Sequence, residues 1–71
     1  LIVDQSKEAR NHNIIVALLD GEFTTKRLIK EKGKVFLVPE NEEYQKIEVK
    51  AHHEFKIWGV VTGMVRDSQH I

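Results

Sequence analysis

Lys26 is the side chain whose type and setting best fit catalytic chemistry in this sequence of 71 residues. It follows Glu22-Phe23-Thr24-Thr25, and the run from 22 to 30 has the composition of a β-strand. A lysine amine accepts a proton only when it is neutral. Burial among apolar groups favours that form because it removes the water that solvates an ammonium. Lys26 is therefore a candidate general base, although a strand lysine more commonly extends its amine into solvent.

A hairpin turn at Asp20-Gly21 determines what surrounds Lys26. Asp-Gly between two β runs predicts a two-residue type I′ turn, in which both central residues have positive φ. The predicted register pairs Leu19 with Glu22, Leu18 with Phe23, Ala17 with Thr24, Val16 with Thr25 and Ile15 with Lys26. Alternation then places Lys26 on one face with Ile15, Ala17, Thr24 and Leu28. The opposite face carries Ile14, Val16, Leu18, Phe23, Thr25 and Arg27.

The other polar side chains give weaker signals. His52 and His53 are adjacent, so in a strand they would point to opposite faces and could not share a metal. The absence of cysteine excludes a disulfide framework, a thiolate zinc site and a cysteine nucleophile. The remaining candidates are interpreted as solvated or structural: His12, His70, Ser6, Ser68, the acidic Glu40, Glu42 and Glu43, and Trp58 with Phe55 and Ile57. We expect no cofactor and no metal site.

The elements that must position Lys26 are almost all strands, because β-branched and aromatic residues cluster in short runs bounded by Gly, Pro, Asn and Asp. Strands are predicted near 1–3, 13–19, 22–30, 34–38, 46–50 and 54–66, with a turn at Lys32-Gly33. A helical turn is expected at Lys7–Asn11. The prediction is an all-β fold, a small rolled, barrel-like sheet of hairpins, in one domain over 1–71.

Two of these runs are apolar on both faces. Ile14–Leu19 is apolar throughout, which predicts a central strand covered on both sides. The last run places Trp58, Val60 and Met64 on one face and Ile57, Val61 and Val65 on the other, with Gly59 and Gly63 marking a bend, a bulge or a close backbone approach. We expect Phe55–Arg66 to take part in a homodimer, because both its faces need cover. Cover by a preceding segment of the same subunit is the alternative.

Composition limits the classes of function. Lys plus Arg and Asp plus Glu both number 11, so the net charge is zero and we expect no direct DNA binding. No apolar run approaches the roughly 20 residues that cross a bilayer, so we expect no membrane partner. The chain opens on Leu1-Ile2-Val3 without a Met, as a cut through a strand would, and we expect a piece of a longer protein.

Three segments resemble one known family, in that family's order. Asp20-Gly21-Glu22-Phe23-Thr24-Thr25-Lys26-Arg27-Leu28 is similar to the Asp-Gly-Glu-x-Thr-x-Lys-Arg/Lys-Leu segment of the LexA/UmuD family, the self-cleaving serine–lysine peptidases of the S24 class. Val35–Asn41 with Tyr44 resembles its LxPxNxxY/F segment, and Ile57–Val61 resembles its closing hxGhV strand. Leu1-Ile2-Val3-Asp4 resembles the strand just after the family's nucleophile region, so the likeness covers nearly the whole chain.

The resemblance implies that Lys26 is the general base. In the family the lysine takes a proton from a serine, which attacks a peptide bond in the protein's own N-terminal arm. In the family that serine lies several dozen residues before the lysine, in a Ser-Met/Gly motif that is absent here. Ser6 follows the Leu1–Asp4 segment, so the resemblance implies that it is not the nucleophile. The chain is therefore expected to be the C-terminal part of one S24-type peptidase domain, inactive alone. His12-Asn13 stands where the family commonly has Gly-Asp, which leaves that turn open.

Within the family, Phe23 favours the UmuD type. That reading implies an SOS-response protein, bacterial and cytoplasmic, whose cleavage is stimulated by RecA filaments on single-stranded DNA. Its processed homodimer would join an error-prone, UmuC-type translesion polymerase. One alternative is the C-terminal autoproteolysis and dimerisation domain of a LexA-like or prophage repressor. An alternative of another class is a non-catalytic β-barrel interaction module.

Overall fold

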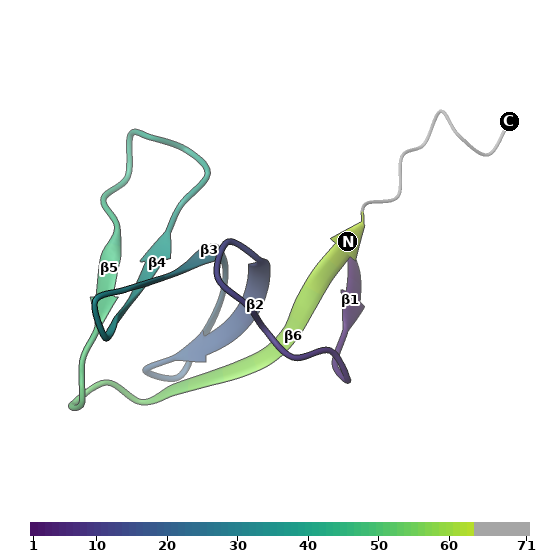
Figure 1. The fold of residues 1–71 in the computed structure, drawn as a ribbon, viewed down its shortest axis with the longest axis horizontal. Coiled ribbons are helices and arrows are strands. Elements are labelled where there is room, and N and C mark those ends of the chain that lie inside the picture. Colours follow the sequence, from purple (N-terminus) through teal and green to yellow (C-terminus); the bar gives the residue numbers. More distant parts are fainter. Residues whose placement is uncertain (64–71) are drawn as a thin grey trace, which may run out of the picture.

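The computed structural model describes residues 1–63. Its strands form one antiparallel sheet in the spatial order β1-β6-β2-β3-β4-β5 (Figure 1). They are β1 (Ile2–Asp4), β2 (Ile14–Leu19), β3 (Glu22–Glu31), β4 (Lys34–Val38), β5 (Ile47–Val49) and β6 (Phe55–Gly63). The predicted all-β fold is confirmed, with bounds close to those expected. Met64, Val65, Arg66, Ser68 and His70 lie outside the described residues.

The two predicted hairpin turns are both present. Asp20 and Gly21 have φ values of 49° and 87°, and every predicted pair from Leu19 with Glu22 to Ile15 with Lys26 is observed. Lys32 and Gly33 have φ values of 50° and 76° and join β3 to β4, with Glu31 opposite Lys34. Positive φ at both central residues is the geometry of a type I′ turn. The local turn chemistry therefore fixes the register that places Lys26.

The segment before β2 is a turn, so the predicted helical turn at Lys7–Asn11 is wrong. The Asn13 N–H donates to the Arg10 carbonyl at 3.0 Å, and the Arg10 N–H donates to Asn13 Oδ1 at 2.8 Å. His12 has a φ of 76°, in the region that favours glycine, and its N–H donates to the Leu28 carbonyl at 2.7 Å. Asparagine side chains compete with helix formation in this way. The turn links the start of β2 to β3.

The sheet rolls so that its separated strands meet. Leu19 of β2 and Ile47 of β5 line one cavity, although β3 and β4 stand between them in the sheet. The fully buried side chains lie inside this roll and come from β2, β3, β4 and β6: Ile15, Ala17, Leu28, Leu37 and Val60. Phe55, Ile47 and Val49 pack against them in part. Figure 1 shows how the long, curved β6 runs from the end near β5 to the end that pairs with β1.

A β-bulge in β6 overturns the predicted faces of that strand. Val16 pairs with Gly59 but Ala17 pairs with Ile57, so Trp58 is the extra residue opposite the β2 ladder. Val60 is buried in the core, whereas Trp58 lies on the other face, beside Val16. The prediction that Trp58 and Val60 share a face is wrong because strict alternation fails at a bulge.

At Gly59 the backbone of β6 lies close to β1, which is one of the features that a glycine within a strand predicts. A Cβ at Gly59 would lie 2.5 Å from Val3 Cγ1 and 3.3 Å from the Asp4 carbonyl oxygen, both in β1. A Cβ at Gly63 would meet nothing nearer than 3.5 Å. Only the first glycine is therefore required by the packing of β1 on β6.

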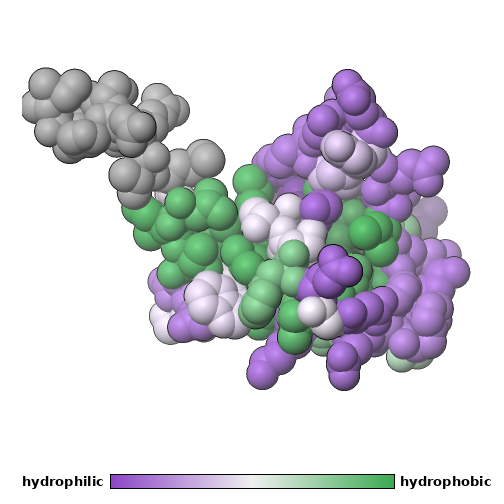
Figure 2. All heavy atoms as spheres, turned by 180° about the vertical axis from the view of Figure 1, so that it is seen from behind, coloured by the Kyte–Doolittle hydropathy of each residue, from purple (hydrophilic) through white to green (hydrophobic). Residues whose placement is uncertain are grey.

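The outer face of the sheet is not fully covered in the range 1–63. β2 is central, as predicted, but only Ile15 and Ala17 are buried, while its alternate residues keep some exposure. Phe23 is 66% exposed and Trp58 is 45% exposed, with their rings edge to face at a centroid distance of 6.4 Å. In Figure 2 the hydrophobic atoms gather toward the end where β1 and β6 pair, and the hydrophilic atoms cover the opposite end. The prediction of cover on both faces of β2 is wrong for the described residues.

Candidate active site

Lys26 lies in the middle of β3, on the face predicted for it. It pairs with Ile15 of β2, and Leu28, the next residue on that face, is fully buried. Lys26 itself is half-buried. The stem of the side chain therefore starts from the rigid centre of the sheet, and only its amine needs to reach the surface.

The Lys26 amine is held by its own strand. Nζ donates to Thr24 Oγ1 at 2.7 Å and makes a longer contact, 3.4 Å, with the Thr25 carbonyl oxygen. Thr24 stands two residues before Lys26, so the strand period places both on one face. The sequence analysis did not identify Thr24 as a functional residue, although this spacing was its signal. A hydroxyl that accepts from an amine orients the nitrogen without adding a charge.

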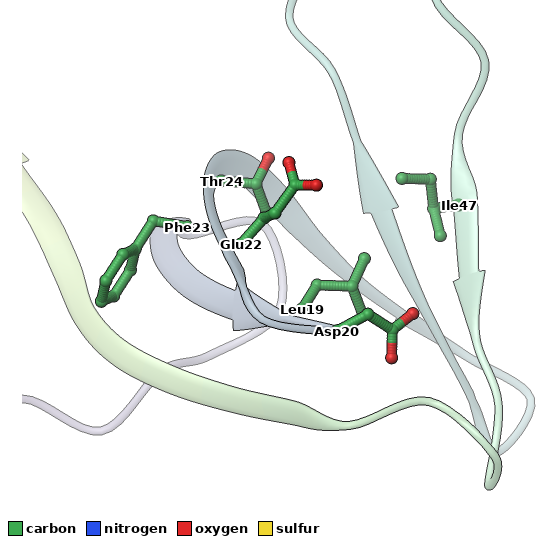
Figure 3. A pocket seen from close by; sticks show the side chains of 6 residues that line it. All are labelled: Leu19, Asp20, Glu22, Phe23, Thr24 and Ile47. Atoms are coloured by element: carbon green, nitrogen blue, oxygen red, sulfur yellow. The ribbon is translucent and has the colours of Figure 1, made fainter.

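A cavity of about 340 Å³ opens next to Thr24. Its walls are Leu19, Asp20, Glu22, Phe23, Thr24 and Ile47, which come from β2, the turn, β3 and β5 (Figure 3). Figure 3 shows the Glu22 and Thr24 side chains on one side of β3 and the Phe23 ring on the other. The wall therefore combines apolar groups with two carboxylates and the hydroxyl that binds Lys26. A side chain of an extended segment could enter it.

Arg27, the neighbour of Lys26, holds β3 from the opposite face. Its Nη2 forms an ion pair with Glu40 Oε1 at 2.6 Å, and its Nη1 donates to the His12 carbonyl at 2.7 Å. The hydrogen bonds that Arg27 donates to the Glu40 carboxylate raise the pKa of Arg27 above its ordinary value. Arg27 thus ties β3 to the segment after β4 and to the turn before β2. Glu40 is a structural partner, as the sequence analysis expected of the acidic segment.

The histidine pair lies in the connection between β5 and β6. The rings of His52 and His53 are 4.2 Å apart, so the prediction that they point to opposite faces is wrong, because both residues belong to a turn. The described part of the chain still contains no group of His, Asp and Glu that could hold a metal. It also contains no helix that could span a membrane.

Ser6 is engaged with Asp4. Its Oγ and its N–H both donate to Asp4 Oδ1, at 2.6 and 2.8 Å. The hydrogen bond from the Ser6 hydroxyl, followed by that from its N–H, lowers the pKa of Asp4 below its ordinary value. These bonds give Ser6 a structural role at the end of β1.

The chain is similar in sequence to curated proteins named LexA repressors. The chain is 43% identical over 68 residues to the LexA repressor of Paracidovorax citrulli, an alignment that covers 96% of this chain and 30% of the relative. It is 43% identical over 68 residues to that of Shewanella piezotolerans (94% and 33%), and 44% identical over 66 residues to that of Bordetella avium (93% and 31%). The chain therefore spans about a third of the length of these curated relatives.

The matches favour the LexA-like alternative over the UmuD type, because these relatives are named LexA repressors. The expected membership of the LexA/UmuD family of self-cleaving serine peptidases is confirmed. The family model described as Peptidase S24-like matches residues 1–62, nearly all of the described structure. On this match and on the repressor relatives, the chain belongs to the Peptidase S24-like family.

Proposed function

We propose that this chain is the C-terminal part of the self-cleaving domain of a LexA-like repressor, which we call the parent, and that Lys26 is its general base. The observation that carries the proposal is the 2.7 Å contact between Lys26 Nζ and Thr24 Oγ1 on the half-buried face of β3. It supports the proposal because a general base must be held in one orientation before a proton can reach it. The repressor relatives support the same assignment.

In this mechanism the neutral Lys26 amine takes the proton of a serine hydroxyl that the preceding part of the parent supplies. The serine oxygen then attacks the carbonyl carbon of a peptide bond in the parent's own chain. As the peptide C–N bond breaks, the protonated Lys26 returns its proton to the leaving amine, and water hydrolyses the resulting acyl-enzyme with the neutral Lys26 again as the base. Thr24 is a positioning residue, since it accepts an N–H from Nζ and leaves the nitrogen lone pair directed elsewhere. The chain described here lacks the serine motif, so by itself it is proposed to be inactive.

The partners proposed for the parent follow from the repressor assignment. They are a second copy in a homodimer and the RecA filament on single-stranded DNA as the stimulus for cleavage, in the bacterial cytoplasm. Cleavage would separate this domain from a DNA-binding half and inactivate the repressor.

A second candidate is the UmuD type, which Phe23 favours. There the trimmed homodimer would join a UmuC-type polymerase. The sequence that precedes Leu1 in the parent distinguishes the two, because a helix-turn-helix indicates a repressor and a short arm indicates UmuD.

The direct test is the rate of self-cleavage of the purified parent as a function of pH. We expect the rate to rise toward alkaline pH, since only the neutral amine accepts a proton. Lys26→Arg should be inactive at every pH because a guanidinium stays charged. A flat profile, or activity in Lys26→Arg, would refute the lysine base.

Thr24 provides a second, finer test. Thr24→Val keeps the shape of the side chain but removes the acceptor, and we expect cleavage to slow about tenfold, as the loss of one hydrogen bond to a charged or polar group predicts. Thr24→Ser should restore the rate and the pH profile. An unchanged rate in Thr24→Val would show that the 2.7 Å contact plays no part in cleavage.

A further inference from the structure

The connection between β5 and β6 is closed by one imidazole ring. The Lys50 N–H donates to His53 Nδ1 at 2.9 Å, and the His53 N–H donates to the Lys50 carbonyl at 3.0 Å. His53 is half-buried, whereas His52 is exposed. An imidazole nitrogen accepts a hydrogen bond only when it carries no proton. The geometry therefore requires neutral His53 with its proton on Nε2.

Protonation of His53 would break this closure. In the imidazolium both ring nitrogens carry protons, so Nδ1–H and the Lys50 N–H would be two donors facing each other. Their separation fits a hydrogen bond, which requires one donor and one acceptor. The His52 ring, centred 4.2 Å away, would add repulsion if it were also charged.

The closed turn is also attached to the hairpin that carries Lys26. Glu54 follows His53 directly, and its N–H donates to Asp20 Oδ1 at 2.9 Å while its carbonyl accepts from the Asp20 N–H at 2.8 Å. Asp20 is one wall of the cavity beside Thr24. These two hydrogen bonds hold the start of β6 against the β2–β3 turn, directly after the turn that His53 closes.

The titratable residues near His53 come from its own turn and from the facing one. Lys50 and Glu54 are close to it in sequence, the His52 ring is centred 4.2 Å away, and Asp20 on the facing turn accepts the Glu54 N–H. The Lys50 N–H can donate a hydrogen bond to His53 Nδ1 only when the ring is neutral. We propose that residues 50–54 form a pH-sensitive latch, which neutral His53 closes and protonated His53 opens.

The test is amide hydrogen exchange of the folded parent at about pH 8 and about pH 5, on either side of the ordinary imidazole range. After correction for intrinsic exchange rates, the protection of the Lys50 amide should fall at least tenfold at the lower pH. Long-range nitrogen–proton spectra of histidine-labelled parent should show Nδ1 of His53 unprotonated at the higher pH. These measurements do not involve cleavage, so they succeed or fail independently of the proposed function.

Variants of the two histidines make the result specific. His53→Asn places an amide oxygen near the position of Nδ1, and it should keep Lys50 protected at both pH values because it does not titrate. His53→Ala should leave Lys50 unprotected at both, and His52→Asn should keep the loss at low pH. Equal protection of Lys50 at both pH values in the unchanged protein, or a proton on Nδ1 at the higher pH, would overturn the latch. An unaltered pH response in His53→Asn would overturn it as well.

Discussion

The two faces of the β2–β3 hairpin are similar in sequence and different in environment. Ile15 and Ala17 on one face are fully buried, whereas Phe23 on the other is 66% exposed. The difference comes from the roll of the sheet, which brings Leu37 and Val60 from other strands over the inner face only. An apolar sequence therefore shows that a strand can be buried. The curvature of the sheet determines which of the two faces of the strand is buried.

This difference also separates two neighbouring cations. Lys26 lies on the inner face, where its amine meets the Thr24 hydroxyl, and Arg27 lies on the outer face, where it pairs with Glu40. A permanent ion pair suits a residue that fixes the backbone. In the proposed mechanism the Lys26 amine loses and regains a proton, and a hydroxyl partner is compatible with this role because it carries no charge.

The largest expected effect separates these two residues directly. Lys26→Ala in the parent should slow self-cleavage by about a hundred- to ten-thousandfold, the range for loss of a general base. Arg27→Ala is the matched control, since it removes one cation from the next position on the outer face and should cleave at nearly the unchanged rate. Gel assays of the two variants at one alkaline pH check this. Equal losses would mean that the face of β3 does not matter.

The next effect compares stability on the two faces. Leu28→Ala removes a side chain that is 1% exposed and should lower the free energy of unfolding by about 2–5 kcal/mol. Phe23→Ala, on the exposed outer face, should cost about 1 kcal/mol or less, mainly from its edge contact with Trp58. Urea denaturation of the parent measures both. A loss in Phe23→Ala as large as that in Leu28→Ala would show that another part of the parent covers the outer face.

A smaller effect tests the edge at which the outer face meets β1. Gly59→Ala would bring a Cβ to 2.5 Å from Val3 Cγ1 and should destabilise the protein by about 1–3 kcal/mol. Gly63→Ala, where the nearest atom is 3.5 Å away, is the control and should be neutral or slightly stabilising. Thermal unfolding of both variants decides the matter. Equal melting temperatures would contradict the close packing of β1 on β6.

The smallest effect belongs to the end of β1. Because the bonds from Ser6 lower the pKa of Asp4, the folded protein favours its carboxylate. The resulting stability is present above the ordinary value of 3.8 and is lost as the pH falls through the lowered pKa. Ser6→Ala removes the hydroxyl bond, so it should move the titration of Asp4 upward and remove part of the stability that this bond contributes above pH 3.8, including near neutral pH. Carbon NMR of the Asp4 carboxyl follows this, and an unmoved midpoint would show that the hydroxyl contributes nothing.

The sequence predicted most where local chemistry alone determines structure. Asp20-Gly21 specifies a turn with two positive φ angles, so the register, and with it the face of Lys26, followed from two residues. The bulge at Trp58 was not predictable in the same way, because it depends on the fit of β6 between β1 and β2. The strand prediction thus located Gly59 correctly but not the faces that follow from it.

The candidate site was predictable only in part, for a related reason. Strand period places Thr24 and Lys26 on one face, but it does not show that their polar atoms meet. The cavity wall at Ile47 depends on the roll of the sheet, which brings β5 near β2. Adjacent positions in the sequence predict opposite faces for His52 and His53, whereas hydrogen bonds across the turn place their rings side by side. Which residues of one strand share a face can therefore be predicted from the sequence, whereas contacts that depend on the roll of the sheet cannot.

The position of β6 in the sheet governs the order in which the chain can be assembled during synthesis. β2, β3, β4 and β5 pair with their neighbours in sequence and can fold as they leave the ribosome. Among the strands described here, β1 is made first, yet its partner in the sheet is β6, which is made after the other five, and β6 is also the second neighbour of β2. Until β6 is available, no other strand within residues 1–63 pairs with β1 or with that edge of β2. The nascent chain thus exposes an aggregation-prone edge for as long as translation takes to reach Gly63.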